Sequence, residues 1–186
     1  MYTTRSYGAI WPLLFGLLLT ACDELKLEKT KTSLKNKETS SFFHPWTENG
    51  LSYGEDVSSY IPVYSGVYVS GGGKLNLAIT LSVRNTDFSY PLLVKKVSYY
   101  NTAGQLIENY LKTPHLLEPM ASTHFFVTQA DARGGVGANF IVTWATDKRA
   151  NAPIIEAVMA GSTGTQGMSF ISSGREMKVS EKEEEK

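Results

Sequence analysis

The sequence is poor in cysteine and has no excess of charge of either sign. Cys22 is the only cysteine among 186 residues, so the chain cannot form an internal disulfide. The 18 Lys and Arg side chains are balanced by 18 Asp and Glu side chains. A chain of zero formal net charge implies no polyanionic partner, and we therefore expect no binding of nucleic acid.

Recognisable patterns of catalytic and metal-binding residues are also missing. The histidines His44, His115 and His124 lack the spacing of metal ligands, and no second cysteine can join them, so no metal site is expected. The nucleophile elbow G-x-S-x-G does not occur. The sequence therefore predicts no catalytic residue and no cofactor, and it favours a protein that binds over an enzyme. A hydrolytic enzyme stays open as an alternative.

No apolar run in the sequence is long enough to cross a membrane. The longest runs from about Ala9 to Leu19 and is interrupted by Pro12 and Gly16, whereas a transmembrane helix needs about 20 apolar residues. This run follows a short polar start that contains Arg5, and small residues lead from it towards Cys22. That arrangement is typical of a secretory signal peptide.

The end of this segment, Leu19-Thr20-Ala21-Cys22, resembles the lipobox of bacterial lipoproteins. The resemblance implies that the thiol of Cys22 carries a diacylglycerol, that the chain is cut before Cys22, and that the new amino group receives a further acyl chain such as palmitate. Two or more acyl chains, at about 0.8 kcal/mol per buried methylene, anchor a protein stably. We therefore expect a protein tethered to a bacterial membrane, facing the periplasm or the cell surface. Asp23 resembles the residue that favours retention at the inner membrane.

Composition divides the chain into four segments. Residues 1–21 form the predicted signal peptide, residues 22–56 the lipidated N-terminus and a flexible tether, residues 57–175 a folded domain, and residues 176–186 a charged tail. Over residues 23–50, lysines are mixed with acids and hydroxyl side chains, and apolar residues are few. Such a segment cannot bury enough apolar surface to fold by itself.

Between tether and tail, short apolar segments are separated by turn residues. Over residues 75–84 every second side chain is Leu, Ile or Val, which predicts a strand with one buried face. Further strands are expected at residues 61–69, 92–100, 105–111, 123–128, 140–146, 154–160 and 168–172. No window of ten or more residues shows helical periodicity.

Seven or eight short strands without intervening helices predict an all-β fold, an antiparallel β-sandwich. Residues 117–123 resemble the turn that precedes a strand in many exported immunoglobulin-like domains, so we expect an immunoglobulin-like sandwich. A small closed β-barrel is the alternative. Trp144, which follows Phe140 and Val142 at period two, is expected in the core of either fold.

The stretch DARGGVGANF, residues 131–140, carries three glycines before an apolar run. A phosphate-binding loop follows a strand and opens a helix, so that backbone N–H groups converge on the anion. Here the glycines lead into a predicted strand, and the lysine and hydroxyl of a nucleotide loop are missing. We therefore predict that Gly134, Gly135 and Gly137 supply positive φ angles in a hairpin loop or bulge.

Polar residues of this loop are candidates for binding. Asp131, Arg133 and Asn139 would be displayed at one end of the sandwich, and loops held on rigid scaffolds often carry function. The alternative is that the loop has a purely structural role.

Glu156 is a fourth candidate, because it lies within an apolar run and shares a strand face with Ile154 and Val158. A buried acid needs a partner, for which Arg84, Arg133 and Arg175 are available. One interpretation is a structural ion pair or an outward-facing acid on an edge strand. The other is a carboxylate in a functional pocket.

Several stretches together resemble the bacterial domain-of-unknown-function family 3124, over roughly residues 57–175. These stretches are YIPVYS at residues 60–65, LAITLSVRNTD at 77–87, GGVGANF at 134–140, EAVM at 156–159 and QGMSF at 166–170. The resemblance implies an exported lipoprotein domain with no assigned activity, and it lends no catalytic residue. We expect a binding or interaction module of the cell envelope, with membrane lipid at Cys22 and an envelope protein or small ligand as partner. An accessory subunit of an envelope complex is the alternative.

Overall fold

The folded part of the chain consists of antiparallel strands, as the alternation of apolar and polar residues predicts. The computed structural model describes residues 41–48, 50 and 53–178. The predicted signal peptide, Cys22, the tether before residue 41 and the tail beyond residue 178 lie outside the described residues. Within the described part, no helix is long and apolar enough to span a membrane.

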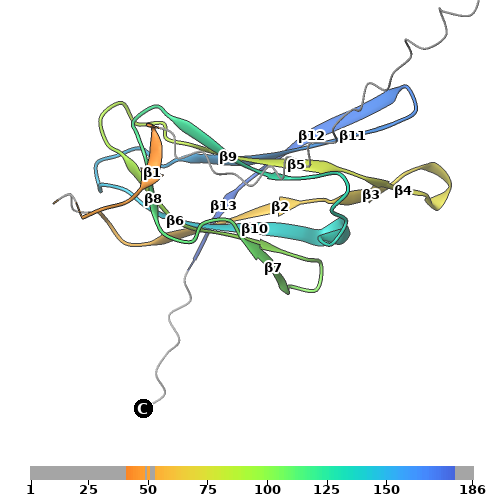
Figure 1. Cartoon of the computed structure of the whole chain (residues 1–186), viewed down its shortest axis with the longest axis horizontal. Helices are drawn as coiled ribbons and strands as arrows, with labels where there is room; N and C mark the ends of the chain where they lie inside the picture. The colour runs from red at the N-terminus through yellow and green to blue at the C-terminus, as the bar shows by residue number, and fades with distance from the viewer. Residues whose placement is uncertain (1–40, 49, 51–52, 179–186) are drawn as a thin grey trace, which may run out of the picture. The chain divides into compact units, whose positions relative to one another are not determined.

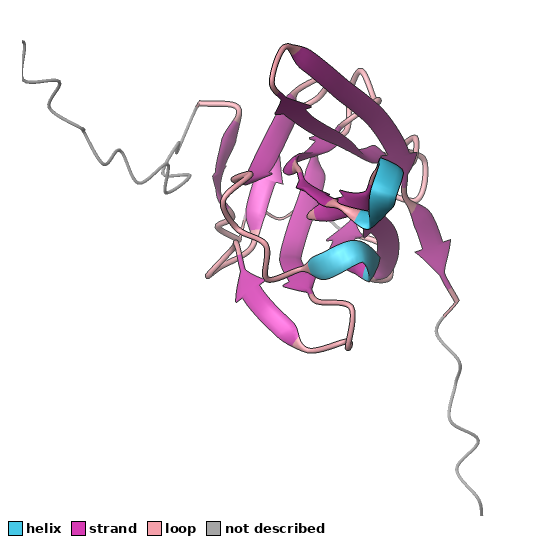
Figure 2. Cartoon of the chain, turned by 90° about the vertical axis from the view of Figure 1, so that its right-hand side faces the viewer, coloured by secondary structure: helices cyan, strands magenta, loops and turns pink. Residues whose placement is uncertain are grey.

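Two sheets make up the sandwich (Figures 1 and 2). The larger sheet has the strand order β1-β8-β6-β10-β2-β13, with β7 paired to the same strand β6, and the smaller has the order β12-β11-β5-β9. A short hairpin, β3-β4, stands apart from both. Neither sheet closes into a barrel, so the predicted sandwich is confirmed and the barrel alternative is not.

The strands of the larger sheet are β1 (Phe43–Pro45), β2 (Val57–Val63), β6 (Leu92–Tyr100), β7 (Leu106–Asn109), β8 (His115–Leu117), β10 (Ala138–Ala145) and β13 (Arg175–Met177). Those of the smaller sheet and the hairpin are β3 (Gly66–Tyr68), β4 (Lys74–Asn76), β5 (Ala78–Arg84), β9 (Ser122–Val127), β11 (Ile154–Thr163) and β12 (Gln166–Ser173).

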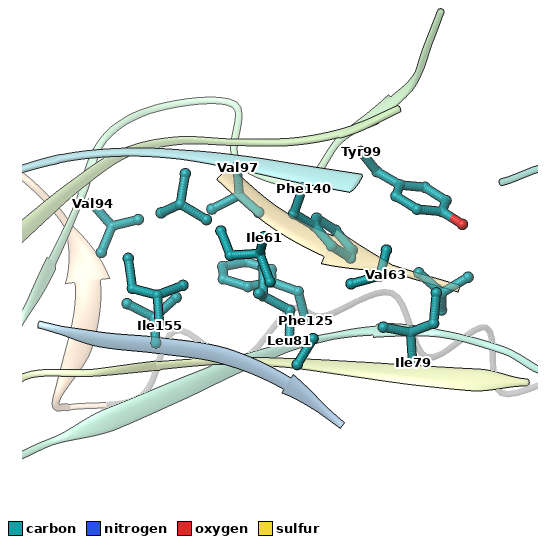
Figure 3. Packing of buried hydrophobic residues seen from close by; sticks show 14 of the residues in the cluster. Ile61, Val63, Ile79, Leu81, Val94, Val97, Tyr99, Phe125, Phe140 and Ile155 are labelled. Carbon is teal, nitrogen blue, oxygen red and sulfur yellow. The ribbon is translucent and has the colours of Figure 1, made fainter. Parts of the chain in front are cut away.

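Side chains from the facing surfaces of the two sheets form the core (Figure 3). On β5, Ile79, Leu81 and Val83 are fully buried, as the alternation predicts. Trp144 is 5 % exposed, as expected, and its Nε1 donates a hydrogen bond to the Ser59 hydroxyl at 3.0 Å. Because the indole N–H has a partner, the ring can lie in the core without a desolvation penalty.

Three short strands are missing from the sequence-based prediction, namely β1, β8 and β13. Strands of three residues are too short to show a period of two, so alternation cannot reveal them. The strand β1 lies in the segment predicted as a flexible tether, but it pairs with β8, and Phe43 is 6 % exposed in the core. Among the described residues, the sandwich therefore already includes Phe43, well before residue 57.

Candidate functional site

The glycine-rich stretch crosses from one sheet to the other. It joins the end of β9, in the smaller sheet, to the start of β10, in the larger sheet. The hairpin prediction was therefore wrong, because a period-two pattern does not tell to which sheet a strand belongs. The strand after the glycines is present as predicted, and the only helical feature is the three-residue 3-10 turn Gly135–Gly137. The arrangement offers no helix N-terminus to an anion.

Two side chains from distant segments pin this crossover loop to the sandwich. The Ser65 hydroxyl accepts a hydrogen bond from the Gly135 N–H at 2.7 Å and donates one to the Gly135 carbonyl at 3.1 Å. The Thr102 hydroxyl donates to the Gly134 carbonyl at 2.9 Å and accepts from the Gly137 N–H at 3.0 Å. The backbone N–H groups of Ser65 and Thr102 bond to the same two carbonyls. The loop is therefore held in one conformation from both sides.

The three glycines serve different purposes. Gly135 alone has a positive φ, +79°, so the prediction for Gly134 and Gly137 was wrong. Gly134 is glycine because a Cβ there would collide with the Tyr99 hydroxyl and approach the Tyr99 Cζ to 2.8 Å. At Gly137 a Cβ would lie 3.2 Å from the Thr102 methyl group. Close approach between segments, rather than backbone conformation, thus explains two of the three glycines.

An ionic cluster lies on the surface of the crossover loop. Arg133 donates two hydrogen bonds to the Asp131 carboxylate, from Nε at 2.8 Å and from Nη2 at 2.6 Å. Its Nη2 also lies 3.7 Å from Glu108 Oε2, on β7. The Arg133 hydrogen bond holds the pKa of Asp131 below its usual value, and Asp131 raises the pKa of Arg133. Both groups are therefore charged at neutral pH.

Two tyrosines lie next to this cluster, at the end of the core. Tyr99 stacks on Phe140 with ring centroids 4.8 Å apart, and Tyr110 packs against the same ring at 5.8 Å. Burial raises the pKa of Tyr99 to about 12 and also raises the pKa of Tyr110. The nearby Ser65 hydroxyl offsets the effect on Tyr99 only in part, and the buried Tyr99 hydroxyl makes no hydrogen bond of good geometry within the described residues. Figure 3 shows this hydroxyl at the edge of the core.

The structure does not bring the four predicted binding residues together. Asp131 and Arg133 touch each other, but Asn139 lies on β10 with its neighbours Pro62 and Tyr100 in the adjoining strands. Phe140 beside it is buried, so Asn139 lies on the outer face of the larger sheet. No signal in the sequence pointed to Glu108, because it is far from the loop along the chain.

Glu156 lies on β11, and its side chain is on the outer face of the smaller sheet. The buried face of this strand carries Ile155, Ala157 and Met159. Glu156 Oε1 is 3.2 Å from Arg84 Nη2, one of the three partners considered for it. Glu156 therefore forms an outward-facing ion pair, and β11 is an inner strand of the smaller sheet and not an edge strand.

The opposite end of the sandwich holds a polar network to which no pattern in the sequence pointed. The buried Asn85 side chain donates to the carbonyls of Leu117 and Glu118 at 3.2 and 3.1 Å. The Asp87 carboxylate accepts from the Ser89 and Asn151 N–H groups at 2.8 and 2.9 Å. These hydrogen bonds, together with one from the Tyr90 N–H, hold the pKa of Asp87 below its usual value.

A shallow hollow of about 390 Å³ lies near this network and is lined by Glu55, Val57, Trp144 and Lys148 among others. Besides Glu55, the lining contains the carboxylate of Asp147, which accepts hydrogen bonds from Arg149 at 2.9 and 3.1 Å. Within the part of the chain that the structure describes, no three His, Cys, Asp or Glu side chains are placed to hold a metal ion.

Comparison with known proteins gives a family but no function. A family model described as "Protein of unknown function (DUF3124)" matches residues 56–177. No curated protein matches the sequence. The crystal structure of Thermotoga maritima 1070 is similar in part, with a TM-score of 0.39 and 9 % identity, over 64 % of this chain and 92 % of that one. A likeness at this level says nothing about function.

Proposed function

We propose that this chain, which belongs to the DUF3124 family of proteins of unknown function, is a lipid-anchored interaction module of the bacterial cell envelope. In this proposal it binds a protein partner through the crossover loop and catalyses no reaction. The acylated N-terminus keeps the sandwich close to a membrane, and the loop end presents the recognition surface.

The observation that carries the binding proposal is the fixed position of Arg133. Its side chain is 59 % exposed, yet Asp131 and Glu108 hold the guanidinium from two sides. The loop beneath it is pinned by Ser65 and Thr102. An exposed polar group that is already ordered loses little entropy when a partner binds, which is how pre-organised loops gain affinity.

The charges of the cluster indicate the kind of partner. Two carboxylates and one guanidinium leave one net negative charge, because the depressed pKa of Asp131 keeps that residue ionised. Two N–H donors of the guanidinium bond to Asp131, and its Nη2 also faces the Glu108 carboxylate. The cluster therefore favours a basic or donor-rich protein surface over an anion such as a phosphate.

The anchoring proposal is supported by the lone cysteine and the lipobox-like residues 19–22. Mass spectrometry of the mature N-terminus tests it, and a diacylglycerol on Cys22 is the expected result. Replacement Cys22→Ala should block lipidation and processing and leave the precursor held by its apolar segment. An unmodified Cys22, or cleavage at another position, would refute the anchor.

Affinity capture of the full chain from its own membranes tests the binding proposal. Asp131→Ala should abolish recovery of the partner, because it removes a carboxylate that a basic surface would contact and one of the two groups that hold Arg133. It should not lower the melting temperature, since isolated surface ion pairs contribute little to stability. Asp147→Ala is the matched control, because Asp147 accepts the same bidentate pair of hydrogen bonds from Arg149 near the opposite end of the sandwich. If both variants retain the partner, the crossover loop is only structural. A small molecule recovered in place of a protein would contradict the proposed partner class.

A further inference from the structure

The strand β12 is an unusual edge of the smaller sheet. It is eight residues long, its outer side pairs with no strand, and residues 161–174 contain no charged side chain. Met168 and Ile171 on it are 39 % and 63 % exposed. Soluble proteins usually protect such an edge with charge, proline, short length or a covering segment, because free N–H and C=O groups invite another strand. Here none of these protections is found among the described residues.

The other edge strands of the described sandwich are protected in these ways. The strands β1, β7 and β13 have only three or four residues each. In addition, β1 contains Pro45, β7 contains Glu108, and β13 contains the charged residues Arg175 and Glu176. On β9, the free edge is approached by Tyr110, whose hydroxyl donates to the Phe126 carbonyl at 3.5 Å. The contrast isolates β12 as the edge that is left open (Figure 1).

The register of the hairpin shows which backbone groups of β12 are free. The Gly174 N–H bonds to the Ile155 carbonyl at 2.8 Å, which makes these two residues a hydrogen-bonded pair. Such pairs alternate along an antiparallel ladder, so Ser172, Phe170 and Met168 bond to β11. The N–H and C=O groups of the residues between them, Gly167, Ser169 and Ile171, therefore point away from the sheet.

We propose that β12 pairs antiparallel with β12 of a second copy of this chain, about a two-fold axis near Ser169. A two-fold axis places each strand beside its own copy, so a charge near the axis would be brought close to the same charge on the second copy. A strand with no charged residue avoids this repulsion, and this is the feature that distinguishes β12. The inference does not rest on the proposed binding by the crossover loop.

The sizes of the side chains fit this pairing. With Ser169 opposite its own copy, Ile171 lies opposite Gly167, which leaves room for it, and Phe170 lies opposite Met168 on the other face. Phe170 already contacts Tyr64 edge to face, with ring centroids 5.8 Å apart, and Tyr64 is 37 % exposed. The second copy would cover the apolar surface of Tyr64, Met168 and Phe170 and extend the four-stranded sheet to a continuous sheet across both chains.

Light scattering on the full chain in detergent, over a range of protein concentrations, tests the proposal. We expect a dimer whose dissociation constant rises at least about fivefold in Ser169→Lys, since like charges directly opposite each other destabilise strand pairing. Ala160→Lys is the matched control. Ala160 pairs with Ser169 within the chain, is exposed on the same face, and lies one strand away from the edge. This control should dimerise like the unmodified chain.

Disulfide cross-linking provides a second measurement that does not depend on a weakened dimer. Ser169→Cys should form a covalent dimer on oxidation, whereas Ala160→Cys should show only the background from Cys22 that the unmodified chain shows. A chain that stays monomeric at its highest soluble concentration would overturn the proposal. So would equal dimerisation of both lysine variants, equal cross-linking of both cysteine variants, or a different protein bound along β12.

Discussion

At the residue scale, Gly134 and Gly135 are adjacent glycines that are needed for different reasons. The first makes room for the Tyr99 ring, and the second has a positive φ of +79°. A side chain at Gly134 therefore meets the Tyr99 ring, whereas one at Gly135 is strained by the positive φ and also approaches Thr102, with its Cβ 2.5 Å from the hydroxyl oxygen. A second substitution can separate these two causes.

We predict that Gly134→Ala and Gly135→Val each lower the free energy of unfolding by about 1–3 kcal/mol. Tyr99→Phe alone should leave it unchanged or raise it slightly, because the hydroxyl it removes is buried without a good partner. Added to Gly134→Ala, the Tyr99→Phe substitution should restore part of the lost free energy of unfolding. Added to Gly135→Val, it should restore none. Urea denaturation of the two double-mutant cycles measures this coupling. Equal coupling in both cycles would contradict the assignment.

At the element scale, long strands could be predicted from the sequence and their connections could not. The alternation over residues 77–83 predicts a strand with a buried face, and Leu77, Ile79, Leu81 and Val83 are all buried. The pattern does not reveal that the chain leaves one sheet for the other between β9 and β10. Likewise, the contact of Arg133 with Glu108 depends on tertiary packing. The candidate site was therefore predicted only in its local part, Asp131 with Arg133.

The strand β1 offers a test at the same scale. Phe43 is 6 % exposed and packs on Phe125 and His115, with ring centroids 6.3 and 4.9 Å away. Phe43→Ala should lower the free energy of unfolding by about 3–5 kcal/mol, as for other buried aromatic residues. Phe42→Ala is the control, because Phe42 is 43 % exposed. Thermal unfolding compares the two variants. Similar melting temperatures would mean that β1 belongs to the tether after all.

At the scale of the whole sandwich, polar side chains tie together the connections that cross between the sheets. At one end, Ser65 and Thr102 fix the crossover from β9 to β10. At the other end, Asn85 and Asp87 join three crossovers: β5 to β6, β8 to β9, and β10 to β11. The described strands of one sheet are not hydrogen-bonded to those of the other. These connections therefore help the packing of the core to fix the position of one sheet on the other.

The acid stability of the sandwich should therefore depend on Asp87. Its folded-state pKa lies below the usual 3.8 because the Asn151, Ser89 and Tyr90 N–H groups bond to the carboxylate. A depressed pKa contributes stability that is present above pH 3.8 and is lost as the pH falls through the folded-state value. Asp87→Asn removes this titration, so the difference in unfolding midpoint between the unmodified chain and the variant should shrink as the pH falls from 7 to about 3.

Urea unfolding at several pH values measures this difference, with Asp147→Asn as the control. The Arg149 side chain lowers the pKa of Asp147 to about 2, but the carboxylate of Asp147 accepts its hydrogen bonds from Arg149 in the same connection, and Arg149 is exposed. Its replacement should change the midpoint little at any pH, since an exposed ion pair adds little stability. If the difference in unfolding midpoint between Asp87→Asn and the unmodified chain instead stays constant from pH 7 to 3, the network does not carry the acid stability.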